Sequence, residues 1–129
     1  MDWTVTSALL GCDDPAEVDA AFERREPLTG VAVLGLALNV LDPGLVAPRL
    51  HRAMADEDSE IRRCGALAVG HMARLNGTVD DESLALLRQL AEDPVPIVRG
   101  TVDDALDDIH MFAPHVSKAL DAVRDVMGA

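Results

Sequence analysis

Aromatic residues and lysine are scarce in this chain. Of its 129 residues, one is Trp, two are Phe and none is Tyr, and the only lysine is Lys118. Eleven Lys and Arg stand against 23 Asp and Glu, which gives a formal net charge of −12. A nucleic-acid binder needs a basic footprint for phosphates, and a single-strand platform also needs aromatic rings for stacking. The composition therefore argues against a nucleic-acid partner.

Long apolar runs and cysteine motifs are also missing. The longest weakly polar run, residues 28–41, is shorter than the roughly 20 residues that a membrane helix needs. The first residues show no basic and apolar segments of a secretory signal. Cys12 and Cys64 have neither a C-x-x-C spacing nor metal-type neighbours, so we expect reduced cysteines in the core. We therefore expect a cytoplasmic protein that does not associate with membranes.

Strand patterns are nearly absent, whereas helix signals recur along the chain. No segment alternates apolar and polar residues with β-branched or aromatic enrichment. Asp-Pro pairs at 14–15, 42–43 and 93–94 each place a capping carboxylate before a proline suited to a first helical turn. The sequence therefore predicts an all-α protein. Helices are expected over residues 2–10, 15–24, 29–41, 44–55, 59–75, 80–92, 95–111 and 114–127.

The predicted helix pairs repeat. Residues 56–72 align with residues 93–109 at a constant offset of 37, which places Ile61 over Val98 and Ala68 over Ala105. A weaker first copy lies 35 residues upstream of the middle one, and it lacks the Asp and the Arg of the other two. An internal period of this length is typical of stacked helical repeats.

The repeated pattern resembles that of HEAT repeats: an Asp in the turn, an apolar-Arg pair opening the next helix, and an Ala-rich helix with a final aliphatic-Gly step. The resemblance covers roughly residues 15–111. It implies one domain folded as a short right-handed α-solenoid. The implied parts are the domain 1–129, the hairpins 15–41, 44–75 and 80–111, and the capping helices 2–10 and 114–127. The family pattern also implies that four residues are structural ties between repeats: Asp56, Arg62, Asp93 and Arg99.

Four aspartates interrupt the third copy. Asp103, Asp104, Asp107 and Asp108 stand where the middle copy has small or neutral residues. Carboxylates one helical turn apart repel each other, and Asp is a mediocre former of helix interiors. The aspartates form either a surface for a cationic partner or a polar cap at the end of the repeats. The two alternatives are compatible, because Asp103 and Asp107 can face the helix 114–127 while Asp104 and Asp108 face the groove.

Motifs for metal binding and catalysis are weaker. Asp103, Asp107 and His110 share a helix face and could supply oxygen and nitrogen ligands, but a fourth ligand would have to come from His71 or His115. No Gly-x-Ser-x-Gly elbow or Gly-rich phosphate cradle is present, and the serines occupy positions typical of caps and helix surfaces. We therefore expect no cofactor and no enzymatic activity. A lyase-type or metal-binding HEAT-repeat protein is the less favoured alternative.

Together these observations favour a protein-interaction module whose acidic surface binds a basic protein. An inhibitor or immunity-type protein that neutralises a nuclease toxin is one such module, and a scaffold or adaptor subunit of a larger complex is the alternative. We expect a monomer or a weak homodimer, with Trp3 covering the N-terminal end of the stack. The residues expected to contact the partner are Asp103, Asp104, Asp107, Asp108 and His71.

Overall fold

The computed structural model describes residues 1–116, which contain seven α-helices and a short 3-10 helix. No strand occurs among these residues, so the predicted all-α class is confirmed for them. The elements are α1 (Thr6–Leu9), α2 (Pro15–Arg24), α3 (Thr29–Asn39), α4 (Pro43–Met54), α5 (Ser59–Asn76), α6 (Asp81–Leu90), α7 (Pro96–Phe112) and η1 (Pro114–Val116).

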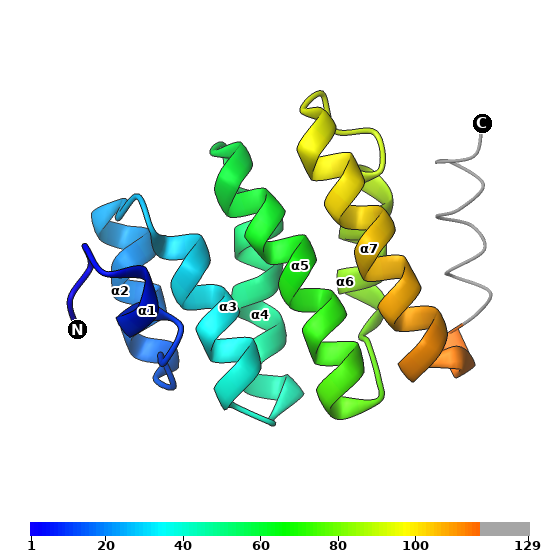
Figure 1. Cartoon of the computed structure of the whole chain (residues 1–129), viewed down its shortest axis with the longest axis horizontal. Helices are drawn as coiled ribbons and strands as arrows, with labels where there is room; N and C mark the ends of the chain where they lie inside the picture. Colours follow the sequence, from blue (N-terminus) through cyan, green and yellow to red (C-terminus); the bar gives the residue numbers. More distant parts are fainter. Residues whose placement is uncertain (117–129) are drawn as a thin grey trace.

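The helices form two layers (Figure 1). In one layer α3, α5 and α7 lie side by side with α5 in the middle, and α2, α4 and α6 lie behind them. A short turn joins each back helix to the front helix that follows it, which makes three successive antiparallel pairs. Buried apolar side chains between residues 12 and 113 form one continuous core. Each pair thereby buries a face that it could not bury alone.

Two glycines bring α5 close to its neighbours. A Cβ atom at Gly65 would lie 2.9 Å from Met54 Cγ and 3.0 Å from Ala53 Cβ of α4. A Cβ atom at Gly70 would lie 3.3 Å from the Cα of Ala105 in α7. Neither position has room for a larger side chain. α5 therefore packs closely against α4 of the other layer and against α7 of its own layer.

Three helices, α2, α4 and α5, begin at capping aspartates, and two of these caps were predicted from Asp-Pro pairs. Asp14, Asp42 and Asp58 each accept a backbone N–H of the first helical turn, at 2.9, 2.9 and 2.8 Å. The prediction that Asp93 caps a helix is wrong, because α7 begins at Pro96 and has no side-chain cap. The Asp93 carboxylate is instead held within the turn and by an ion pair described below.

The N-terminal segment contains less helix than the sequence predicts. Only α1 is helical within the range 2–10, because Asp2 accepts hydrogen bonds from the backbone N–H and the hydroxyl of Thr4, and Val5 is extended. Trp3 is partly buried against the core, and the guanidinium carbon of Arg24 lies 5.6 Å from the centre of its ring. Trp3 therefore packs at the N-terminal end of the stack.

Both cysteines are free thiols in the core, as predicted. Burial raises the pKa of Cys12 above its usual value and raises the pKa of Cys64 to about 11. The thiolate, which is the reactive form, is therefore rare at both positions.

Two findings concern membrane-spanning helices and the predicted C-terminal helix. Within residues 1–116, no helix is long and apolar enough to cross a membrane. Of the helix expected over residues 114–127, residues 114–116 form η1 and the others lie outside the described residues.

Candidate functional site

α7 turns one face to the core and the opposite face outward. Its buried residues recur at helical spacing: Val98, Thr101, Val102, Ala105, Leu106 and Ile109. On the other face Asp103, Asp104 and Asp107 are exposed, and Asp108 is half-buried. The outward direction of the aspartates follows from this periodicity, since the buried positions fix the rotation of the helix.

The four aspartates are not equivalent. Asp103 and Asp107 each take part in an interaction within the chain, so we do not count them as open carboxylates. The prediction that they face the helix 114–127 falls largely on residues 117–127, which lie outside the described residues. Asp104 makes no hydrogen bond or ion pair with any residue in the described part of the chain. It is therefore the most open carboxylate of the four.

Asp108 lies against α5 near His71. A Cβ atom at Gly70 would lie 2.8 Å from Asp108 Oδ2, so the glycine makes room for this carboxylate. Burial lowers the pKa of His71, Arg74 lowers it further, and Asp108 partly opposes both effects. An Arg74 guanidinium nitrogen lies 3.1 Å from His71 Nδ1. His71 is therefore mainly neutral at pH 7. Arg74 lies beside it on α5.

Apolar side chains accompany the open carboxylates on α7. Ile97 is 61% exposed and Met111 is 72% exposed. Gly100 lies between them along the helix, and a Cβ atom there would meet no other atom within 4 Å. We define the α7 surface as the residues Ile97, Gly100, Asp104, Asp108 and Met111. This surface combines negative charge with exposed apolar area.

The predicted ties form a connected set at the junction of the second and third helix pairs. Arg62 of α5 donates to both carboxylate oxygens of Asp93, at 2.8 and 3.2 Å, and to the carbonyls of Asp56 and Glu57, at 3.0 and 2.8 Å. Arg99 donates to the Asp93 carbonyl at 2.6 Å. One guanidinium thus joins two successive turns, with the paired geometry that favours arginine over lysine.

The charge of Asp93 is stabilised by this arrangement although the residue is only 6% exposed. Burial alone would raise its pKa, but hydrogen bonds from Arg62 and from the Val95 N–H, with the charges of Arg62 and Arg99, outweigh burial and lower the pKa. The ion pair therefore contributes to stability at neutral pH.

Asp56 occupies the corresponding turn of the second pair, between α4 and α5, but its carboxylate has no such partner. Its Oδ1 accepts the N–H of Asp58 at 2.8 Å, as Asp93 Oδ1 accepts the N–H of Val95 at 2.9 Å. In the described part of the chain, no guanidinium forms an ion pair with the Asp56 carboxylate. The structure brings Arg62 to Asp93 and leaves Asp56 outside the side-chain tie.

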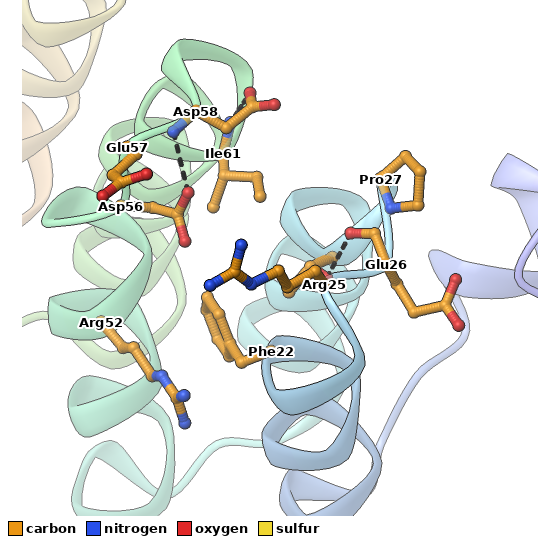
Figure 2. Close-up of a pocket in the computed structure, with 10 residues that line it drawn as sticks. Phe22, Arg25, Glu26, Pro27, Arg52, Asp56, Glu57, Asp58 and Ile61 are labelled. Atoms are coloured by element: carbon orange, nitrogen blue, oxygen red, sulfur yellow. Dashed lines mark hydrogen bonds between the residues drawn. The ribbon is translucent and has the colours of Figure 1, made fainter.

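A pocket of about 310 Å³ opens beside Asp56, between the turn after α2 and the turn after α4. Four carboxylates and two guanidiniums line it, with an apolar floor (Figure 2). The lining residues are Phe22, Arg25, Glu26, Pro27, Thr29, Arg52, Asp56, Glu57, Asp58 and Ile61. The volume lies at the lower end of the roughly 300 to 1,000 Å³ typical of ligand pockets.

The two arginines of the pocket differ in how they are held. The Arg52 guanidinium pairs with Glu23 at 2.8 Å and lies 4.6 Å from the centre of the Phe22 ring. Arg25 reaches across Phe22 toward Asp56 (Figure 2), and its guanidinium makes no hydrogen bond or ion pair with the described residues. Its backbone is left-handed, with φ 56°, at the end of α2. Glycine is the usual residue in this conformation.

A set of His, Asp and Ser residues also lies between α4 and α6. His51 Nε2 is 2.7 Å from Asp80 and 3.0 Å from the Ser83 hydroxyl, and His51 Nδ1 is 3.2 Å from Glu82. A nucleophilic serine needs an accessible hydroxyl activated by a base. Ser83 is fully buried, and its hydroxyl donates to Asp80 at 2.7 Å. These interactions therefore join α4 to the start of α6 and have a structural role.

Metal binding has no support within residues 1–116. No group of three or more His, Cys, Asp and Glu residues there is placed to hold a metal ion.

Comparison with known proteins adds no further assignment. No protein family model, curated protein or solved structure matches the chain. The function is therefore argued from the geometry of the α7 surface and of the pocket.

The residues of the pocket were not identified by sequence reasoning. A usable signal existed, because α5 carries Arg62 in its first turn, whereas the positions 35 to 37 residues earlier precede the start of α3 at Thr29. The position 37 residues before Arg62 is Arg25, which lies in the turn outside α3, so no first helical turn presents an arginine to Asp56 at this junction. The location of Arg25 and Phe22 depends on the angle between α2 and α4, which the sequence alone does not give.

Proposed function

We propose that the protein is a non-enzymatic interaction module, a short right-handed HEAT-like solenoid that binds a basic protein through the α7 surface. The order of the two layers and the Arg62 tie support the proposed solenoid. The observation that carries the proposed function is the open carboxylate of Asp104, beside the half-buried Asp108 and between the exposed side chains of Ile97 and Met111.

The chemistry of the α7 surface favours a cationic partner. In a chain with net charge −12, a further acidic surface attracts basic proteins over long distances and speeds their encounter. Exposed Ile97 and Met111 supply apolar area that the same partner can bury. Gly100 lets a partner approach the helix backbone closely, since no side chain of its own intervenes. An inhibitor or immunity-type protein that covers the cationic site of a nuclease toxin has these requirements.

The proposal is tested by affinity capture with three proteins at physiological salt. They are the wild type, the reversal Asp104→Lys/Asp108→Lys, and the control Asp13→Lys/Glu92→Lys, which changes the net charge equally at exposed positions away from the α7 surface. A basic protein should bind the wild type and the control, and the reversal should weaken its affinity by at least about tenfold. Equal loss in both variants would show a general charge effect and would contradict the site.

The alternative of a scaffold or adaptor subunit has one supporting observation. Leu41 and Leu45 near the start of α4 are 64% and 44% exposed, and apolar side chains at an edge favour assembly. Light scattering across a concentration series tests it. Stable oligomers that dissociate in the variant Leu41→Ser/Leu45→Ser would favour this alternative, whereas a monomer at all concentrations would count against it.

A further inference from the structure

We propose that the pocket beside Asp56 binds a guanidinium group, supplied by an arginine side chain of the basic partner. This inference rests on the proposed function for the source of the arginine. It deepens that function by adding a second contact site, on α2, α4 and α5, to the α7 surface.

The protein contains its own example of the proposed interaction. At the junction of the second and third pairs, the carboxylate of Asp93 binds the guanidinium of Arg62 through two nitrogens, at 2.8 and 3.2 Å. Asp56 has the same local geometry, since Oδ1 of each aspartate accepts the N–H two residues later. The backbone carbonyl of each also accepts a bond from the arginine of the following helix. Asp56 differs in lacking an ion pair, because Arg25 of the preceding pair reaches toward it (Figure 2) without forming one.

The pocket exists because α3 is shorter than α5. α5 has 18 residues and carries Arg62 in its first turn, whereas α3 has 11 and begins at Thr29. The chain before α3 is occupied by the turn that contains Arg25 and Pro27, so no helical residue extends toward Asp56 at this junction. Arg25 from that turn reaches into the space next to the carboxylate without pairing with it, and the remaining space forms the pocket (Figure 2).

The charges and the floor of the pocket suit a guanidinium on a long apolar stem. Four carboxylates outnumber two guanidiniums, and Arg52 is already paired with Glu23. Phe22 and Ile61 offer apolar contact to the methylene groups of an arginine side chain. A planar guanidinium can form two parallel bonds to one carboxylate, which an ammonium group cannot.

Arg25 is the competing charge in this pocket. Its backbone is left-handed and its side chain reaches toward Asp56 (Figure 2), without an ion pair in the described part of the chain. Glycine is the preferred residue in this left-handed conformation. Arg25→Gly therefore removes the competing charge without straining the backbone. The variant Arg25→Gly should therefore bind a guanidinium more tightly than the wild type.

The test is a titration with N-acetyl-L-argininamide, followed through the backbone amide signals of Phe22, Asp58 and Ile61 in two-dimensional NMR spectra. We expect saturable shifts at these residues and weaker binding of N-acetyl-L-lysinamide. Asp56→Asn should weaken argininamide binding by at least about tenfold, because it keeps the turn acceptor and loses the charge. The matched control Asp13→Asn removes one negative charge at an exposed position outside both the pocket and the α7 surface, and should leave the affinity unchanged.

Argininamide that fails to bind would overturn the inference, and so would two further results. One is argininamide binding that Asp56→Asn does not weaken. The other is acetate binding that shifts the same amide signals and is abolished by Arg25→Gly, since the pocket would then be a carboxylate site. Neither result bears on the α7 surface, because that proposal is tested by reversal of Asp104 and Asp108. If the reversal abolishes partner binding and argininamide fails to bind, only the pocket inference is wrong.

Discussion

Removal of the Arg62 guanidinium tests the tie between the second and third helix pairs. Arg62→Met keeps most of the apolar stem and deletes the bonds to Asp93 and to the carbonyls of Asp56 and Glu57. The Asp93 carboxylate then stays buried without its paired cation, because its side chain is only 5% exposed. The backbone N–H of Val95 remains as its hydrogen-bond donor.

The expected loss is about 3 kcal/mol in the free energy of unfolding at pH 7. Breaking a buried ion pair by removing one partner costs roughly 3 to 5 kcal/mol, most of it from the uncompensated charge. The lower end applies because the Arg62 side chain is 15% exposed and Asp93 keeps its bond from Val95. Arg63→Met is the matched control. Its partner Glu60 has a side chain that is 58% exposed, so we expect about 0.5 kcal/mol or less.

The pH dependence gives a second check on the same variant. In the wild type the pKa of Asp93 is lowered from 3.8, so its contribution to stability is present above that pH and is lost as the pH falls through the lower native pKa. In Arg62→Met burial remains while the main lowering cause is gone, so the pKa of Asp93 rises. The deficit relative to the wild type should therefore shrink between pH 7 and pH 4.

Urea unfolding, followed by helical circular dichroism at several pH values, measures these differences. The reasoning would be refuted by a loss no larger than that of Arg63→Met, or by a deficit that does not change with pH.

Three further predictions concern packing, thiol reactivity and ligand binding. Gly100→Ala should raise the free energy of unfolding by about 0.5 to 1 kcal/mol, because an exposed helical glycine has open space for a Cβ. Gly65→Ala should lower the free energy of unfolding by about 1 to 3 kcal/mol, because the added Cβ would contact Met54 and Ala53 too closely. Urea unfolding measures both glycine variants, and equal effects would contradict the close packing of α5. With a pKa of about 11 against 9.0, native Cys64 should react with a thiol reagent at least about a hundredfold more slowly than in urea at pH 8, and equal rates would contradict its burial. Argininamide at ten times its dissociation constant should stabilise the wild type by about 1.4 kcal/mol in thermal unfolding, and the same concentration should stabilise Asp56→Asn by about 0.4 kcal/mol or less.

The sequence predicts helix starts correctly where the capping side chain bonds to a residue close to it in the chain. Asp14 and Asp42 cap helices as expected, because each bond joins residues two positions apart. Asp93 was misassigned because its carboxylate accepts from Arg62, which is 31 residues away in the sequence. A cap signal cannot reveal that competing long-range partner.

The candidate site was predictable only in part. The helical period places four aspartates outward on α7, and the structure separates Asp104 from Asp103 and Asp107, which take part in other interactions. The pocket depends on two non-local facts, the late start of α3 and the left-handed turn at Arg25. A non-glycine residue in that conformation is uncommon, so sequence rules do not anticipate where its side chain points.

Departures from the repeat pattern and unneutralised charge coincide in this protein. Where the pattern is complete, at Arg62 and Asp93, the carboxylate is paired within the chain and its role is structural. The first copy lacks the tying arginine and leaves Asp56 beside an open pocket, while the third copy replaces neutral positions by aspartates and leaves Asp104 open. Both departures leave a carboxylate without an ion pair in the described part of the chain. A basic partner that contacts both sites would span most of the stack, since the pocket lies at α2 and α4 and the α7 surface lies beyond α5 (Figure 1). Its affinity should then fall with either Asp56→Asn or the reversal of Asp104 and Asp108, whereas a partner confined to α7 would respond to the reversal alone.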